Sequence, residues 1–415
     1  MVLDVTRRVA RGALLSRELG RALDTSELEA RERSLVTDLV YGVARWRIWL
    51  DAALAPHLAR PQGLPEAVQA ILRLGAYDRL KRETPAHAAV HAWVNVTKRE
   101  APRFAGLVNA VLRRVTPPTR DLDPATEHAL PRWLWDAFEA ALGDDAPAAV
   151  AAMRQPAPLW FATFRLDAEE ALAAQGADVK AGPVTGTIRV RSERRPGDLA
   201  GFETGALQPL NPTSALVTQA LPAQPGDRVL DLCSGRGVKT ALLAARGFHV
   251  TGIEREAKKA EQARRNLSRL HLDAEHVTRD LTRTPDDVPP APYVLIDAPC
   301  SGTGTLRGHP EIVERLTASD VTELARTQRD LLDTAYHLTE PGGTLVYSVC
   351  SLTREEGPDV IAHFLETHPD ATLSPVPWSE LAPHVPTRDA SVGTYLLPRD
   401  GLDGFFVARM TRNAR

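Results

Sequence analysis

Residues 228–254 read RVLDLCSGRGVKTALLAARGFHVTGIE, which has the order of a strand, a tight turn, a helix and a second strand. RVLDLC and FHVTGIE are short apolar runs of the kind found in strands, and a helical pattern fills the gap between them. Four further runs follow, AEHVTR, YVLIDA, TLVYSVC and FFVARM, with helical stretches between most of them, notably 255–270 and 318–338. This alternation predicts a parallel, doubly wound α/β sheet over residues 206–415.

The first 120 residues have a different pattern. Leucines recur at spacings of three to four, and the segments AAVHAWVNVTKRE (88–100) and GLVNAVLRRV (106–115) continue this helical periodicity. Because nothing in 1–120 alternates like a strand, we predict an all-α domain there. The proline-containing segment TPPTRDLDP (116–124) predicts a linker, and the mixed helical and β-like pattern of 121–205 predicts a small α/β connecting domain.

Composition limits the class of protein. Hydrophobic residues make up 43% of the 415 residues and charged residues 25%, which excludes wholesale disorder. No apolar run approaches the 18 residues of a transmembrane helix, and charged residues such as Asp4, Arg7 and Arg8 interrupt any signal peptide, so we expect a cytoplasmic protein. The three cysteines cannot form a disulfide framework and lack zinc-site spacing, so we expect no metal.

The net charge of −3 conceals an asymmetry between the two parts of the chain. Residues 1–120 carry 20 Lys and Arg against 12 Asp and Glu, a net charge of +8, whereas the remainder carries 30 against 41, a net charge of −11. A basic N-terminal domain is typical of a nucleic-acid partner, and an Arg-rich solvated helical surface is the alternative.

In an open α/β sheet, ligands bind beyond the carboxyl ends of the strands. The first strand leads into a Gly-containing turn, and Glu254 follows Gly235 by 19 residues, where a carboxylate can accept hydrogen bonds from ribose hydroxyls. Asp280 either binds an adenine amino group or caps a helix. These features fit any adenosine-bearing cofactor, although Thr240 at the third glycine position of GxGxxG weakens the case for NAD.

Two cysteines follow neighbouring strand patterns, in Asp297-Ala-Pro-Cys300 and in Ser-Val-Cys350-Ser. Parallel strands lie ~5 Å apart, so both thiols open into one pocket if these strands are adjacent. The alternative is that each cysteine is a small buried hydrophobe. Two thiols and a carboxylate beside an adenosyl cofactor suit methylation of carbon 5 of cytosine, because a thiolate adding at carbon 6 makes carbon 5 nucleophilic.

At these residues the chain resembles a known family, the Sun (Fmu) type RNA cytosine-C5 methyltransferases. The likeness rests on DAPCSGTGTLRGHPEI (297–312), EPGGTLVYSVCSLTREEG (340–357) with Gln328 upstream, and DGLDGFFVARM (400–410). LVYGVARWRIWLD, LRLGAYDRL and GLVNAVLRRV are similar to the NusB-like RNA-binding domain of the family's bacterial 16S rRNA members. The resemblance implies a multidomain protein with an all-α NusB-like domain and a Rossmann-like class I methyltransferase domain.

It also implies roles for individual residues. Cys350 is the expected nucleophile, Cys300 assists product release, and Asp297 contacts the base and lies near the cofactor. Arg307 and His309 are expected to face RNA. The S-adenosylmethionine site is expected to comprise Cys233, Ser234, Gly235, Arg236, Gly237, Val238, Lys239, Glu254, Asp280 and Asp297. We expect a monomer whose partner is 16S rRNA, either naked or within a precursor of the small ribosomal subunit.

The sequence departs from the family at several positions, and the segment LQPLNPTS keeps Gln208 but lacks the Asp that usually follows it. Arg236 and Val238 stand where the first motif has Pro and Gly, and Val349 stands where Thr usually precedes the nucleophile. Two rivals therefore stay open. One is a DNA cytosine-C5 methyltransferase in which Cys300 attacks, and the other is a non-catalytic RNA-binding factor of ribosome assembly whose cofactor site has eroded.

Overall fold

A computed structural model describes residues 1–118, 122–283 and 285–414, and the chain divides into two compact units. The first unit comprises residues 1–139 and 306–316, and the second comprises 140–305 and 317–415. The division falls within helix α8 (Arg132–Leu142). Part of the predicted linker, residues 119–121, lies outside the described residues, and α7 (Pro124–Glu127) begins at its end.

The first unit is helical, as predicted, and the described residues of 1–118 contain no strand. Its longest helix, α3, begins with a capping box in which the Glu29 side chain accepts the backbone N–H of Glu32 and the Glu32 side chain accepts that of Glu29. The principal helices are α1 (Val2–Ala10), α2 (Leu15–Asp24), α3 (Ala30–Leu54), α4 (Glu66–Leu80), α5 (Ala86–Glu100), α6 (Ala105–Arg114) and, from the returning segment, α14 (Ile312–Arg315).

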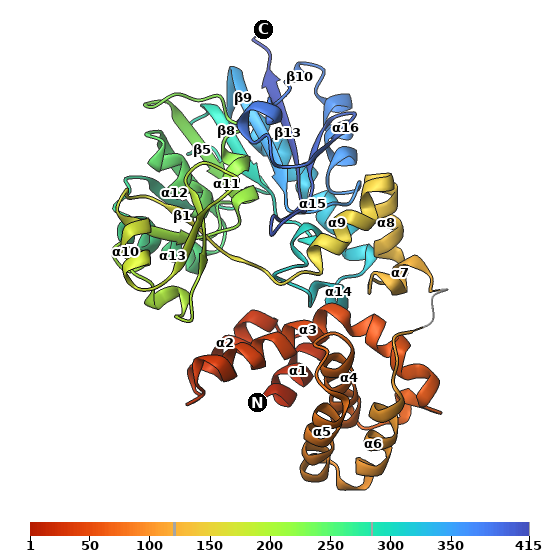
Figure 1. Cartoon of the computed structure of the whole chain (residues 1–415). Coiled ribbons are helices and arrows are strands. Elements are labelled where there is room, and N and C mark those ends of the chain that lie inside the picture. Colours follow the sequence, from red (N-terminus) through yellow and green to blue (C-terminus); the bar gives the residue numbers. More distant parts are fainter. Residues whose placement is uncertain (119–121, 284, 415) are drawn as a thin grey trace. The chain divides into compact units, whose positions relative to one another are not determined.

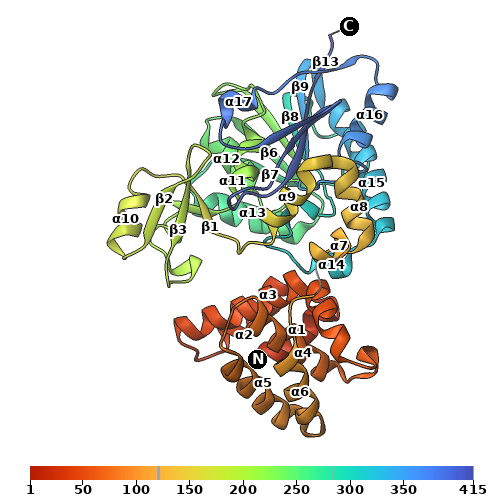
Figure 2. The ribbon, with the colours of Figure 1, turned by 45° about the vertical axis from the view of Figure 1, so that its right-hand side comes forward.

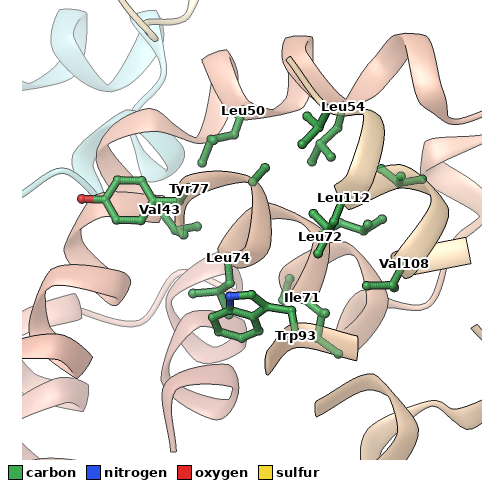
Figure 3. Close-up of a cluster of buried hydrophobic side chains, with 14 of the residues drawn as sticks. Val43, Leu50, Leu54, Ile71, Leu72, Leu74, Tyr77, Trp93, Val108 and Leu112 are labelled. Carbon is green, nitrogen blue, oxygen red and sulfur yellow. The ribbon is translucent and has the colours of Figure 1, made fainter. Parts of the chain in front are cut away.

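The core of this unit lies between α3, α4 and α6 (Figure 3). Leu50, Leu74 and Leu112 are fully buried, and each such leucine contributes about 1.5–3 kcal/mol to folding. Helices α3 and α4 approach closely at Gly42, where a Cβ atom would lie 1.9 Å from the ring of Tyr77. A glycine is therefore required at this crossing.

The second unit is built on a large sheet whose described strands run in the order β11-β12-β13-β9-β8-β5-β6-β7, with β10 paired to β13 (Figure 1). The five strands from β7 to β9 are parallel, as predicted. The strands are β5 (Arg228–Leu232), β6 (His249–Glu254), β7 (Glu275–Thr278), β8 (Ala291–Asp297), β9 (Thr339–Val349), β10 (Ala371–Leu373), β11 (Thr387–Ala390), β12 (Gly393–Leu396) and β13 (Phe405–Arg412).

One strand departs from the prediction of a parallel sheet. The segment FFVARM forms β13, which pairs antiparallel with both β9 and β12. Residues 397–404, which join β12 to β13, are too few for the crossover that parallel neighbours need. The start of β13 consequently lies at the edge of the sheet where β9 ends.

Helices cover both faces of this sheet (Figures 1 and 2). Asp231 of β5 lies opposite Leu295 of β8, and Asp297 lies opposite Ser348 of β9, so Asp231, Asp297 and Ser348 share one face. Helix α12 covers that face. The helices of the second unit include α11 (Pro212–Thr218), α12 (Val238–Ala245), α13 (Ala257–Arg269), α15 (Ala318–His337), α16 (Pro358–Thr367) and α17 (Trp378–Leu381).

A small antiparallel sheet with the order β2-β3-β1-β4 precedes the large one and belongs to the same unit. Its strands are β1 (Leu159–Thr163), β2 (Asp178–Ala181), β3 (Thr187–Arg191) and β4 (Leu207–Pro209), with α9 (Ala146–Met153) and α10 (Ala168–Ala174). Strand β4 lies beyond the expected boundary at residue 205, and 121–205 does not form a separate compact unit. None of the helices in the described residues is long and apolar enough to span a membrane.

Candidate active site

The turn after β5 has an unusual backbone. Cys233, Gly235 and Gly237 have φ angles of +58°, +59° and +73°. A Cβ atom on Gly237 would lie 2.9 Å from the Cβ of Ala263 in α13, so this glycine permits close helix packing as well as the left-handed conformation. The turn brings successive backbone amides to the carboxyl end of the sheet, where a ligand can approach them.

The two departures from the family's first motif leave this turn intact. Arg236 has an exposed side chain, and Val238 is the first residue of α12. The positive φ angles on either side of Arg236 are retained. The substitutions therefore alter side chains at the turn without removing its backbone geometry.

Glu254, at the end of β6, is tied to the same turn. Its carboxylate accepts the backbone N–H of Gly235 at 3.0 Å and that of Glu256 at 2.8 Å, and only 9% of the residue is exposed. Ser234 adds a hydrogen bond of 2.8 Å to Nε2 of His276 in β7. Burial, followed by the charge of Arg264, lowers the pKa of His276, which favours a neutral imidazole. His276 was not among the residues selected from the sequence.

Asp297 is fixed from two sides at the end of β8. Lys239 of α12 places its ammonium 2.6 Å from Oδ2, and Ser348 of β9 donates a hydrogen bond of 2.9 Å to Oδ1. Burial alone would lower the pKa of Lys239, but its attraction to Asp297, together with those to Asp231 and Cys350, raises the pKa. Lys239 therefore remains charged and holds the Asp297 carboxylate in one orientation.

Asp231 is a second carboxylate on this face, and the sequence analysis did not single it out. Its residue is fully buried, and Oδ2 accepts a hydrogen bond of 2.6 Å from Thr240. Oδ1 has no hydrogen-bond partner among the described residues. Burial raises the pKa of Asp231 to about 7, partly opposed by Thr240 and Lys239.

The two strand-end cysteines lie close together because β8 and β9 are neighbouring parallel strands. The Sγ atoms of Cys300 and Cys350 are 3.3 Å apart, and both residues are partly exposed. The hydrogen bond with Cys350, followed by burial, raises the pKa of Cys300 well above its usual range, so Cys300 retains its proton. The pKa of Cys233 is also raised, to about 12, by burial and then by the nearby carboxylates of Glu254 and Asp297.

A buried polar network joins the two cysteine-bearing loops. The carboxylate of Glu356 accepts the backbone N–H of Ser301 at 2.8 Å, the Ser301 hydroxyl, Nε2 of Gln328 at 3.0 Å and the Thr353 hydroxyl at 3.3 Å. Gln328 also donates to the carbonyl of Pro299 at 2.9 Å. Pro299 and Ser301 belong to the Cys300 loop, and Thr353 and Glu356 belong to the Cys350 loop. The network therefore fixes the two loops against each other.

A second set of bonds joins the loops closer to the sulfurs. The Thr303 hydroxyl lies 3.0 Å from that of Ser351 and accepts the backbone N–H of Leu352 at 3.1 Å. The backbone N–H of Gly304 donates to the carbonyl of Cys350 at 2.9 Å. The separation of the cysteines is thus determined by the loops and does not depend on the sulfur contact alone.

The remaining expected site residues are Asp280, His309 and Arg307. Asp280 is exposed, and its carboxylate accepts the backbone N–H of Thr282 at 3.0 Å in a local turn, so it does not cap a helix, which was the alternative considered from the sequence. His309 has a side chain that is 51% exposed. Arg307 is only 2% exposed, which contradicts the expectation that it faces RNA.

The burial of Arg307 follows from the path of its segment. Residues 306–316 belong to the helical unit, where Arg45 donates a hydrogen bond of 3.1 Å to the carbonyl of Arg307. Arg47 of α3 forms an ion pair of 2.6 Å with Glu314, whose side chain is 8% exposed. The segment after the Cys300 loop is therefore an internal part of the first unit.

The side chains gathered at the sheet edge are rich in hydrogen-bond acceptors. Glu254 ends β6 and Asp297 ends β8, and these two strands lie on either side of β5. Asp231 of β5 has a buried oxygen without a hydrogen-bond partner among the described residues. Such a set suits ribose hydroxyls and a positively charged sulfonium. Over the described residues, no group of three or more His, Cys, Asp or Glu side chains could hold a metal ion.

Comparisons with known proteins agree with this architecture. A family model described as 16S rRNA methyltransferase RsmB/F matches residues 218–411, and one described as NusB family matches residues 1–117. Ribosomal RNA small subunit methyltransferase B of Thermus thermophilus is 42% identical over 412 residues, covering 99% of this chain and 97% of the relative. The protein of the same name from Pseudomonas putida is 35% identical, covering 97% and 95% of the two chains.

Among solved structures, that of PH0851 superposes with a TM-score of 0.79 at 21% identity, covering 99% of this chain and 97% of the other. This likeness concerns the fold. Together with the family models, it confirms the predicted combination of a NusB-like helical domain and a Rossmann-like α/β domain.

Proposed function

Because the chain belongs to the family of ribosomal RNA small subunit methyltransferase B, we propose that it methylates carbon 5 of a cytosine in 16S rRNA. The observation that carries the proposal is the 3.3 Å separation of the Cys300 and Cys350 sulfurs beside Asp297 at one edge of the sheet. The reaction needs a nucleophile for carbon 6, a second group that assists release of the product, and a group facing the ring.

The donor for this reaction is S-adenosylmethionine, which when bound supplies an electrophilic methyl group on a positively charged sulfonium. Residues 233–239 would present backbone amides to it, and Glu254 would accept hydrogen bonds from its ribose. Glu254 already anchors the turn through the N–H of Gly235, so the ribose site and the turn are one assembly.

Cys350 is assigned the attack on the base. Its thiolate forms a bond to carbon 6 of cytosine while the electron pair of the C5–C6 double bond moves toward carbon 5. Asp297, oriented by Lys239 and Ser348, lies where a carboxyl group can offset charge on the ring. Attack at carbon 6 requires a base freed from stacking, so the cytosine is expected in a single-stranded or opened segment.

Cys300 is assigned a part in release. After methylation, water accepts the proton of carbon 5, the C5–C6 double bond re-forms and the bond from carbon 6 to the Cys350 sulfur breaks. Cys300 retains its proton and lies 3.3 Å away, so it can donate a hydrogen bond to the departing thiolate. Without this group the covalent complex should persist.

The test compares two cysteine variants with 16S rRNA and S-adenosylmethionine. Cys350→Ala should abolish methyl transfer and form no adduct, whereas Cys300→Ala should accumulate a protein–RNA adduct that survives denaturing electrophoresis. The double variant Cys300→Ala/Cys350→Ala is the control and should lose the adduct. Equal loss of activity in both single variants, with no adduct in either, would contradict these roles.

The cysteine variants and a binding measurement separate the two rival functions. A DNA methyltransferase using Cys300 for attack would reverse the behaviour of the two variants and would act on DNA. A non-catalytic assembly factor would bind RNA but show no binding of S-adenosylmethionine by calorimetry. Bisulfite sequencing of rRNA from a deletion strain identifies the modified cytosine, and purified rRNA and precursor particles serve as alternative substrates. We propose that the protein acts as a monomer in the cytoplasm.

A further inference from the structure

Two cations stand directly opposite each other on the small sheet. Lys180 of β2 is the register partner of Arg189 in β3, and Arg189 is in turn the partner of Trp160 in β1. These three residues therefore form one row across the sheet, on the face opposite the apolar core that contains Phe161 and Ile188. Figure 2 shows the three strands side by side.

This arrangement is unfavourable without an anion. Like charges directly opposite each other on neighbouring strands destabilise a sheet. Lys180 is exposed and Arg189 is half-buried, and neither forms an ion pair with a carboxylate in the described part of the chain. The surrounding segment, residues 178–195, carries five Lys and Arg against two Asp and Glu, although the chain beyond residue 120 is acidic as a whole.

The row lines a hollow of about 380 Å³ between the small sheet and the loop that precedes β13. Arg399 and His384 line its other side and add further positive or titratable groups. The one carboxylate in the lining, Asp400, is exposed and lies 3.7 Å from Arg399. The hollow is therefore open and lined by three cations, and this charge suits an extended polyanion.

A chain of hydrogen bonds connects this hollow to the cysteines. Trp160 and Asn211 both donate to the carbonyl of Gly401, at 3.2 and 2.9 Å. Three residues further along, the N–H of Gly404 donates to the carbonyl of Gly304 at 2.8 Å, and the N–H of Gly304 donates to the carbonyl of Cys350 at 2.9 Å. The cationic row and the reactive sulfurs thus flank the same short loop.

We propose that Lys180 and Arg189 bind the phosphodiester backbone of the RNA strand that carries the target cytosine. The proposal rests on the proposed function, because it takes the polyanion to be the RNA substrate. Both cations would neutralise phosphates of the strand leaving the active site, which relieves their mutual repulsion. The row would position the strand without reading its sequence.

The test measures RNA affinity as a function of salt for Lys180→Gln/Arg189→Gln in the full chain. Each phosphate contact on a single strand contributes about 0.7 to the slope of log K against log salt, so the double variant should lower the slope by about 1.4. Relative to 1 M salt, that change weakens binding about 25-fold at 0.1 M. The probes are transcribed 16S rRNA and a single-stranded RNA of about 16 nucleotides.

Lys258→Gln/Arg326→Gln is the control with the same change of charge, because it removes one lysine and one arginine, both of them exposed. It should leave the slope within about 0.3 of that of the native protein. Lys180→Glu alone, at an exposed position, guards against misfolding of the double variant and should weaken binding in the same direction. An unchanged salt slope in both variants, with native thermal unfolding, would overturn the proposal.

Failure of this inference differs from failure of the proposed function. If the native protein forms 5-methylcytosine but the slope does not change, the cationic row is not an RNA site and the proposed function stands. If the native protein forms no 5-methylcytosine while the slope falls as expected, the row binds RNA and the catalytic proposal fails. An equal fall of the salt slope in the control variant would show that RNA binding depends only on the overall charge of the protein. This result would also refute the inference.

Discussion

Replacing Glu356 tests how the two cysteine loops are held together. The residue is fully buried, and its carboxylate receives four hydrogen bonds, two of them from Ser301, one from Gln328 and one from Thr353. No Lys, Arg or His side chain in the described residues forms an ion pair with it. We compare Glu356→Ala, which removes every acceptor, with Glu356→Gln, which keeps the shape of the side chain.

The two substitutions should differ because alanine offers no hydrogen-bond acceptor, whereas glutamine keeps one acceptor oxygen. Alanine leaves the N–H of Ser301 and one N–H of Gln328 buried without an acceptor, and each costs about 1–3 kcal/mol, so we expect a loss of about 4 kcal/mol. Glutamine can offer its carbonyl oxygen to these two N–H groups. Its amide can donate to the Ser301 and Thr353 hydroxyls, which rotate to accept, so the expected loss is about 1 kcal/mol.

Thermal unfolding measures both losses. In a unit of this size each kcal/mol shifts the Tm by about 2–4 °C, so Glu356→Ala should lower the Tm by about 8–16 °C and Glu356→Gln by about 2–4 °C. Methyl transfer by Glu356→Ala should also fall, because the loops bearing Cys300 and Cys350 are no longer fixed. Equal Tm values for the two variants would refute the reasoning about hydroxyl rotation, and an unchanged Tm for Glu356→Ala would refute the role of the network.

Three further predictions concern the cofactor side of the site. Gly237→Ala should destabilise the protein more than Gly235→Ala, because only the former brings a Cβ within 2.9 Å of another side chain in addition to the strained φ. Chemical denaturation of the pair checks this difference, and equal losses would contradict it. Glu254→Ala should weaken binding of S-adenosylmethionine in calorimetry, and unchanged affinity would reject the ribose contact. Asp231 has a pKa raised from 3.8 to about 7, so its stabilising contribution is present below pH ~4 and lost as the pH rises through about 7. Asp231→Asn should therefore flatten the stability–pH curve in that window, and a curve parallel to that of the native protein would show that the shift is absent.

The sequence predicted most of the fold because its signals are local. Short apolar runs and helical repeats lie within single elements, so β5 to β9 and the N-terminal helices could be located without knowing their neighbours. The direction of β13 was missed because an isolated apolar run does not reveal which strand it pairs with. Its orientation depends on the short connection from β12.

The pair Glu355-Glu356 illustrates what the sequence cannot separate. Both residues look like surface carboxylates, yet Glu355 is exposed and Glu356 is fully buried. Arg307 is the reverse case, a basic residue in a Gly-containing loop that appeared suited to RNA but is enclosed by the helical unit. Burial of a charged residue is decided by long-range contacts, and these leave no periodic trace in the chain.

The return of residues 306–316 to the helical unit has a practical consequence for dissecting the protein. A cut at residue 120 or 139 severs the chain once, but the helical unit would still lose the strip that supplies Glu314 to Arg47 and the Arg307 carbonyl to Arg45. Transplanting the helical unit onto another enzyme would require this strip to be grafted with it. A single cut in the chain therefore cannot separate the two units, because the helical unit contains two separate stretches of the chain.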